Sequence, residues 1–175
     1  MDKEEALVAL RRGMSTEIWG QRFYEEAVAR TEAPVGKRVF QSLVAEDRQH
    51  LDILRGEYAA LRAGNEWISI EDARAMAASV DPTDIFPEAS AAGQLIPEGA
   101  THLQTLEMAK DFERRGYELY DQAAKVATSP EARAMWEYLA RAEDQHYALL
   151  DRTQEYLTTE EVWYFDEQEL PFFDG

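Results

Sequence analysis

The chain has 175 residues, of which 45% are hydrophobic and 30% charged, with a formal net charge of −17 at pH 7. Such an acidic surface repels phosphate backbones, so nucleic-acid binding is not expected. The absence of cysteine excludes disulfides, thiolate zinc sites and Cys-ligated iron centres within these residues. No apolar stretch is long enough to span a membrane, and the N-terminus is a charged amphipathic segment unlike a signal peptide. We therefore expect one cytoplasmic domain over residues 1–175, without membrane or nucleic-acid partners.

Four long helices are predicted along the chain, over about 3–31, 35–63, 100–128 and 130–158. Pro34 and Pro130 separate the two members of each pair, as expected for prolines at helix starts. The proline-containing segment 64–99 is expected to form a long crossover with a short helix near 70–79. The aromatic and acidic segment 159–175 is expected to pack against the helices.

The second helical pair repeats the first at a constant offset of 96 residues, without a gap. The matched residues include Leu7 and Leu103, Leu10 and Leu106, Glu17 and Glu113, Gly20 and Gly116, Tyr24 and Tyr120, Leu43 and Leu139, His50 and His146, and Leu54 and Leu150. This pattern indicates a duplicated helical hairpin. Two hairpins joined by a long crossover predict an all-α, ferritin-like four-helix bundle.

The apolar stripe of every long helix is interrupted near its middle by an acidic residue, and in two helices a histidine follows three positions later. The interrupting residues are Glu17, Asp47, His50, Glu113, Glu143 and His146. Four buried carboxylates without partners would become protonated or open the bundle, whereas two divalent ions would neutralise them. This arrangement matches the di-metal carboxylate pattern of helical bundles, and mixed carboxylate and imidazole ligands suit iron or manganese. The alternative is a degenerate bundle that kept the acids but lost the metal.

The acidic ligand on the second helix has two candidates. Glu46 lies four residues before His50 and therefore reaches the same helix face. The phase of the stripe and the repeat both favour Asp47, whose side chain is one methylene shorter than that of glutamate. Glu46 is kept as the alternative to Asp47.

Two tyrosines and two glycines accompany the acids of the first and third long helices. Tyr24 and Tyr120 follow those acids by two turns and could donate hydrogen bonds to ligands, take part in redox chemistry, or be ordinary buried tyrosines. Gly20 and Gly116 could leave room for a small oxidant beside the metals or simply allow close helix packing.

Four segments of the chain resemble the rubrerythrin family of ferritin-like di-iron proteins: EIWGQRFY (17–24), LVAEDRQH (43–50), ERRGYELY (113–120) and LARAEDQH (139–146). The resemblance covers both hairpins and implies that the six interrupting residues bind two iron ions, with manganese or a mixed metal centre possible. Three features depart from the family pattern. Asp47 replaces a glutamate, the rubredoxin-like domain is absent, and Gly116 stands where the family has a further glutamate used in peroxide chemistry.

The resemblance implies a di-iron oxidoreductase that reduces hydrogen peroxide or dioxygen. Its electrons would come from an external donor such as a rubredoxin or a flavoprotein, and the chain would form a homodimer. Two other functions stay open at this point. One is iron handling, meaning ferroxidation, delivery or storage, and the other is a non-catalytic helical bundle that binds a partner.

Overall fold

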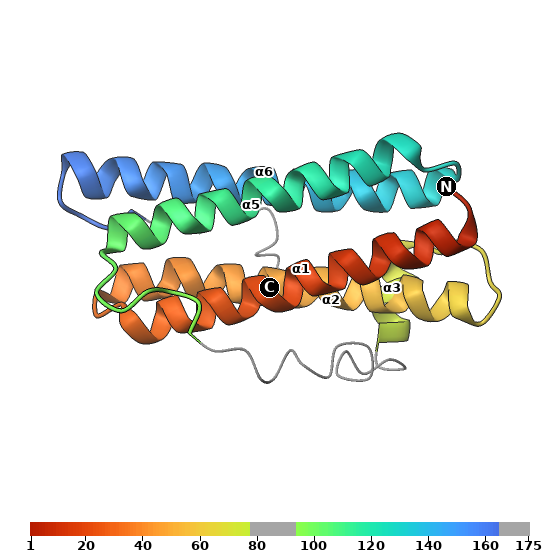
Figure 1. Cartoon of the computed structure of the whole chain (residues 1–175), viewed down its shortest axis with the longest axis horizontal. Coiled ribbons are helices and arrows are strands. Elements are labelled where there is room, and N and C mark those ends of the chain that lie inside the picture. Colours follow the sequence, from red (N-terminus) through yellow and green to blue (C-terminus); the bar gives the residue numbers. More distant parts are fainter. Residues whose placement is uncertain (78–93, 165–175) are drawn as a thin grey trace.

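The structure, a computed structural model, describes residues 1–77 and 94–164, and this part of the chain contains helices and no strand (Figure 1). The helices are α1 (Lys3–Arg30), α2 (Pro34–Arg62), α3 (Ile70–Met76), α5 (His102–Val126) and α6 (Pro130–Thr159). The four long helices begin and end within two residues of their predicted limits, and the all-α, ferritin-like bundle is confirmed. Parts of the predicted crossover and tail, 78–93 and 165–175, lie outside the described residues.

Side chains at the helix starts explain these limits. α1 and α5 open with capping boxes, formed by Asp2 with Glu5 and by Thr101 with Gln104. The Ser129 hydroxyl accepts a hydrogen bond from the backbone N–H three residues later at the start of α6. α2 instead begins with a proline in its first turn, where the missing N–H has no helical partner to lose.

The long helices form two antiparallel hairpins, α1 with α2 and α5 with α6 (Figure 1). α2 ends at one end of the bundle and α5 begins at the other, which is why a long connection is needed between the hairpins (Figure 1). The short helix α3 packs on α2 where Gly56 allows close approach, since a Cβ on Gly56 would lie 1.8 Å from the Ala73 carbonyl oxygen.

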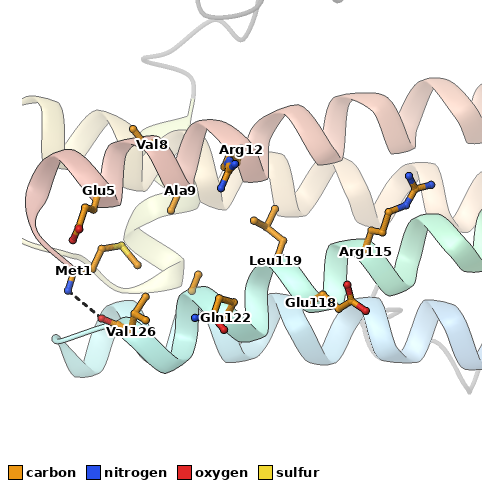
Figure 2. Close-up of a pocket in the computed structure, with 11 residues that line it drawn as sticks. Met1, Glu5, Val8, Ala9, Arg12, Arg115, Glu118, Leu119, Gln122 and Val126 are labelled. Atoms are coloured by element: carbon orange, nitrogen blue, oxygen red, sulfur yellow. Dashed lines mark hydrogen bonds between the residues drawn. The ribbon is translucent and has the colours of Figure 1, made fainter.

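The two hairpins face each other along α1 and α5. These two helices pack less closely against each other than the two helices within either hairpin do. A groove with a cavity volume of about 620 Å³ lies between these helices near the N-terminus (Figure 2). Its lining includes the exposed side chains of Val8 and Val126, and the Met1 amino group closes one end by donating to the Val126 carbonyl at 3.0 Å (Figure 2). None of the predicted metal ligands lines this groove.

The core consists of two apolar clusters, one on each side of the layer where the stripes are interrupted. The first contains Leu10, Met14, Ile53, Leu54, Tyr120, Trp136 and Leu139, and the second contains Phe23, Tyr24, Val39, Phe40, Leu43, Leu106 and Leu150, among others. Along α1, for example, the first cluster precedes Glu17 and the second follows it. The predicted ligands therefore lie in a polar layer sealed at both ends by apolar side chains.

One further carboxylate is buried outside this layer. Glu57 on α2 is fully shielded from solvent, and its Oε2 accepts a hydrogen bond from the Ile68 backbone N–H at 3.3 Å. Burial raises the pKa of Glu57 to about 7, although the Ile68 hydrogen bond acts in the opposite direction. The folded state therefore holds the Glu57 proton at pH values where the unfolded chain has already released it.

Glu57 should make the stability of the metal-free protein fall as the pH rises from about 4.5 to 7. Its pKa is raised in the folded state, so its stabilising effect is present in acid and lost above pH 7. Glu57→Gln should therefore gain about 1–3 kcal/mol in free energy of unfolding relative to the wild type between pH 5 and pH 8, measured by urea unfolding. The control is Glu137→Gln at an exposed position, for which the difference in free energy of unfolding from the wild type should not change with pH. A difference that is also independent of pH for Glu57→Gln would contradict the prediction.

Candidate metal centre

The structure brings the six predicted ligands into one layer of the bundle. α1 and α5 each contribute one glutamate, whereas α2 and α6 each contribute an acid and a histidine three residues apart, which share a helix face. These residues are Glu17, Asp47, His50, Glu113, Glu143 and His146, and none exposes more than 3% of its surface. The layer thus concentrates four carboxylates and two imidazoles away from solvent.

Five of these six side chains form two adjacent clusters that have ligand spacing, and Asp47 belongs to neither, with its Oδ1 4.0 Å from His146 Nδ1. One ligand atom from each of Glu17, His50 and Glu143 lies within 4.8 Å of the others, and the same holds for Glu113, Glu143 and His146. Glu143 belongs to both clusters, so its carboxylate lies between them. Two neighbouring sites with a shared carboxylate are the arrangement that a di-metal centre requires.

Both imidazoles turn Nδ1 toward the carboxylates. His50 Nδ1 lies 3.5 Å from Glu17 Oε2 and 3.7 Å from Glu143 Oε1. His146 Nδ1 lies 3.4 Å from Glu113 Oε2, and the two histidine rings stack with centroids 5.6 Å apart. Among the described residues, neither Nδ1 has a hydrogen-bond partner, and neither do Glu113 Oε2 and Glu143 Oε1. Buried oxygen and nitrogen atoms that lack hydrogen bonds and surround a common centre are the atoms expected to coordinate a bound cation.

The electrostatics of the layer also favour a cation. Burial raises the pKa of Asp47 and of Glu143 well above the ordinary range of a carboxyl group, and the neighbouring Glu17 and Glu113 raise both further. Burial lowers the pKa of His146, but Glu113, Glu46 and Asp47 together more than reverse this effect, so that the pKa lies well above its usual value. Without a cation the layer must take up protons, and the residues present therefore fit a pair of divalent ions.

Gly20 and Gly116 provide the space for two of the carboxylates. A Cβ on Gly20 would lie 2.4 Å from Asp47 Oδ2, and a Cβ on Gly116 would lie 2.7 Å from Glu143 Oε2. Asp47 and Glu143 thus each lie against a helix surface without a side chain, at Gly20 of α1 and at Gly116 of α5. The Glu143 carboxylate occupies the space beside Gly116, so a further glutamate at position 116 could not fit without moving that carboxylate.

Glu46 is buried as well, but it lies behind a histidine. Its Oε2 accepts a hydrogen bond of 3.4 Å from His146 Nε2, on the side of the ring opposite Nδ1. The repeat places Ala142 at the corresponding position, and His50 Nε2 has no hydrogen-bond partner in the described part of the chain. This arrangement favours Asp47 as the ligand and gives Glu46 a supporting position; ligation by Asp47 stays a prediction.

The two tyrosines connect the hairpins through the centre. The Tyr24 hydroxyl donates to Glu113 Oε1, and the Tyr120 hydroxyl donates to Glu17 Oε1. Each tyrosine therefore binds the glutamate of the other hairpin. Burial raises the pKa of both tyrosines well above the ordinary value and the carboxylates raise it further, so both hydroxyls remain protonated donors.

The stacking of aromatic rings on the two tyrosines of the centre was not predicted from the sequence. Phe40 stacks on Tyr24, and Trp136 stacks on Tyr120. The offset of 96 residues pairs Phe40 with Trp136, so extending the repeat comparison to aromatic positions would have identified them. The contact of Glu46 with His146 has no comparable signal because its repeat position is an alanine.

A comparison with models of protein families gives a match over most of the chain. No curated protein and no solved structure matches the chain. Within residues 1–77 and 94–164, no helix has the length and apolar character needed to cross a membrane. A sequence model of the rubrerythrin family, described as Rubrerythrin, matches residues 8–154, which contain α2 and α5 entirely and all but the first five residues of α1 and the last five of α6. The chain belongs to the rubrerythrin family.

Proposed function

We propose that this protein is a di-iron oxidoreductase that reduces hydrogen peroxide or dioxygen with electrons from an external donor. The observation that supports it most directly is the pair of buried Glu/His clusters that share Glu143 and point unpaired donor atoms at one another. The mixed oxygen and nitrogen ligands favour iron, with manganese or a mixed centre as the other possibility.

The side chains around the centre have separate tasks in this proposal. Bound iron would supply the one-electron chemistry. Tyr24 and Tyr120 hold Glu113 and Glu17 in fixed orientations through their hydrogen bonds. The two apolar clusters exclude bulk water from the layer, which strengthens the electrostatic interactions within it. Glu46 fixes the ring of His146 and increases the basicity of its Nδ1.

The electron donor must lie outside these residues. The 175 residues contain no cysteine, so they cannot bind an iron–sulfur or rubredoxin-type centre through thiolates. A rubredoxin or a flavoprotein would supply the electrons. The homodimer, which rests on the family resemblance alone, and the cytoplasmic location expected from the sequence stay predictions.

Asp47→Ala and Glu46→Ala should affect metal binding differently. Metal-free protein titrated with Mn²⁺, or with Fe²⁺ in the absence of air, should bind two ions per chain. Asp47→Ala should lose this stoichiometry because it removes a ligand, whereas Glu46→Ala should keep it with affinity about 10–100-fold lower. Asp144→Ala, next to Glu143 but exposed, is the control and should bind like the wild type. Loss of the second ion in Glu46→Ala, but not in Asp47→Ala, would reverse the assignment.

The ferrous protein should be oxidised by hydrogen peroxide faster than free ferrous iron under the same conditions. Stopped-flow absorption in the near ultraviolet would follow the oxidised iron centre, and Glu143→Ala should abolish the fast reaction because Glu143 is shared by both clusters. Saturation near two irons per chain is expected. Uptake of many irons per chain would favour iron storage instead, and oxidation no faster than that of free iron would refute the proposed function.

A further inference from the structure

A file of aromatic side chains leads from the metal centre to the surface of the first apolar cluster. Tyr120 donates to Glu17, and its ring stacks on Trp136 with centroids 5.8 Å apart and planes at 24°. Trp136 in turn meets Trp67 edge-on, with centroids 6.3 Å apart and planes at 69°. Tyr120 and Trp136 are fully buried, whereas Trp67 is partly exposed. We call Tyr120, Trp136 and Trp67 the Trp136 file.

A second file has the same geometry in the other apolar cluster. Tyr24 donates to Glu113 and stacks on Phe40, with centroids 6.1 Å apart and planes at 22°. Phe40 meets Trp163 edge-on, with centroids 5.9 Å apart and planes at 77°. We call Tyr24, Phe40 and Trp163 the Phe40 file. Both files thus have a stacked inner pair, an edge-on outer pair and a hydrogen bond to a predicted ligand.

The two files are copies of one another in the duplicated sequence. The offset of 96 residues relates Tyr24 to Tyr120, Phe40 to Trp136, and Trp67 to Trp163. They differ only in the middle ring. Indole and phenol rings lose a single electron far more readily than a phenyl ring. The Trp136 file is therefore an unbroken series of oxidisable rings, and Phe40 interrupts the other series.

We propose that the Trp136 file is an electron relay from the protein surface to the metal centre, a role that rests on the proposed function. An oxidising equivalent produced there by peroxide or dioxygen takes one electron from Tyr120, whose hydroxyl proton passes to the Glu17 carboxylate. Trp136 returns an electron to Tyr120, and the proton comes back from Glu17. Trp67 then reduces Trp136, and an external one-electron donor reduces Trp67. Each cycle moves one electron inward and leaves every side chain of the file unchanged.

The surroundings of the file suit this role. Trp136 Nε1 has no hydrogen-bond partner in the described residues, so Trp136 can exchange an electron without giving up its proton to a neighbouring side chain. The Tyr120 proton, in contrast, already has an acceptor in Glu17. Besides the tyrosines of the two files, Tyr138 also lies beside the centre, edge-on to His50 with centroids 6.3 Å apart. Tyr138 is therefore the competing route that the experiment must separate.

The absence of cysteine allows a photo-oxidant to be attached at one chosen place. Glu66→Cys places a ruthenium label beside Trp67, and Val162→Cys places it at the matched position beside Trp163; both native side chains are exposed. Flash-quench oxidation of the full-length, metal-free protein should give a tyrosyl radical from the first label. The radical should be visible by transient absorption and lost in Tyr120→Phe. The second label should leave the oxidation on Trp163.

Exchanging the middle rings provides the decisive comparison. Trp136→Phe should abolish the tyrosyl signal from the first label, and Phe40→Trp should create one from the second label, lost in Tyr24→Phe. The gain in Phe40→Trp keeps the test informative if Trp136→Phe folds poorly. A tyrosyl signal that survives Trp136→Phe, that disappears in Tyr138→Phe instead, or that fails to arise in Phe40→Trp would overturn the relay.

The iron-loaded protein separates this inference from the proposed function. With peroxide and no electron donor, peptide mass spectrometry should find oxidation at Trp67 in the wild type and none there in Trp136→Phe. Electron transfer in the metal-free flash experiment together with no reaction of the loaded protein with peroxide would refute the proposed function alone. Rapid peroxide reduction without transfer along the Trp136 file would refute the relay alone.

Discussion

The interaction on which the rest of the structure depends is the mutual repulsion of the carboxylates buried in the middle of the bundle. Burial raises the pKa of Asp47 and Glu143, and the neighbouring Glu17 and Glu113 raise both further. Such a layer is stable only with cations or protons in it. The surrounding features follow from this need. Gly20 and Gly116 make room for the carboxylates, tyrosine hydroxyls orient the glutamates, and apolar clusters on both sides keep water out.

The duplicated hairpin explains how one short pattern builds the whole centre. Each repeat supplies an acid on one helix and an acid with a histidine on the next, and each tyrosine reaches the glutamate of the other repeat. The first hairpin cannot complete its cluster alone, because Glu17 and His50 are joined there by Glu143 of the second hairpin, whereas the other cluster lies wholly within the second hairpin. The hairpins are therefore held together by the polar layer as well as by their apolar faces, which matters because α1 and α5 leave a groove between them (Figure 2).

The sequence was sufficient to predict the helices and the polar layer because both depend on local periodicity. The 3.6-residue repeat decides which side chains share a helix face, and the duplication shows which interruptions recur. The same periodicity favoured Asp47 over Glu46 as the ligand on α2 but did not exclude Glu46. Neighbouring positions on a helix point about 100° apart, and both of these side chains are buried. What separates them is contact with another helix: Asp47 lies against Gly20, and Glu46 lies against His146.

The differences between the repeats give the two halves of the centre different surroundings. The cluster with His146 has Glu46 behind its imidazole, and its tyrosine stacks on Phe40. The cluster with His50 lacks such a carboxylate, and its tyrosine stacks on Trp136. A carboxylate behind an imidazole increases its basicity and so favours the higher charge on the ion that it binds. Under the proposed function, the half of the centre with Glu46 would therefore hold positive charge on a bound ion more strongly than the half that faces the series of oxidisable rings.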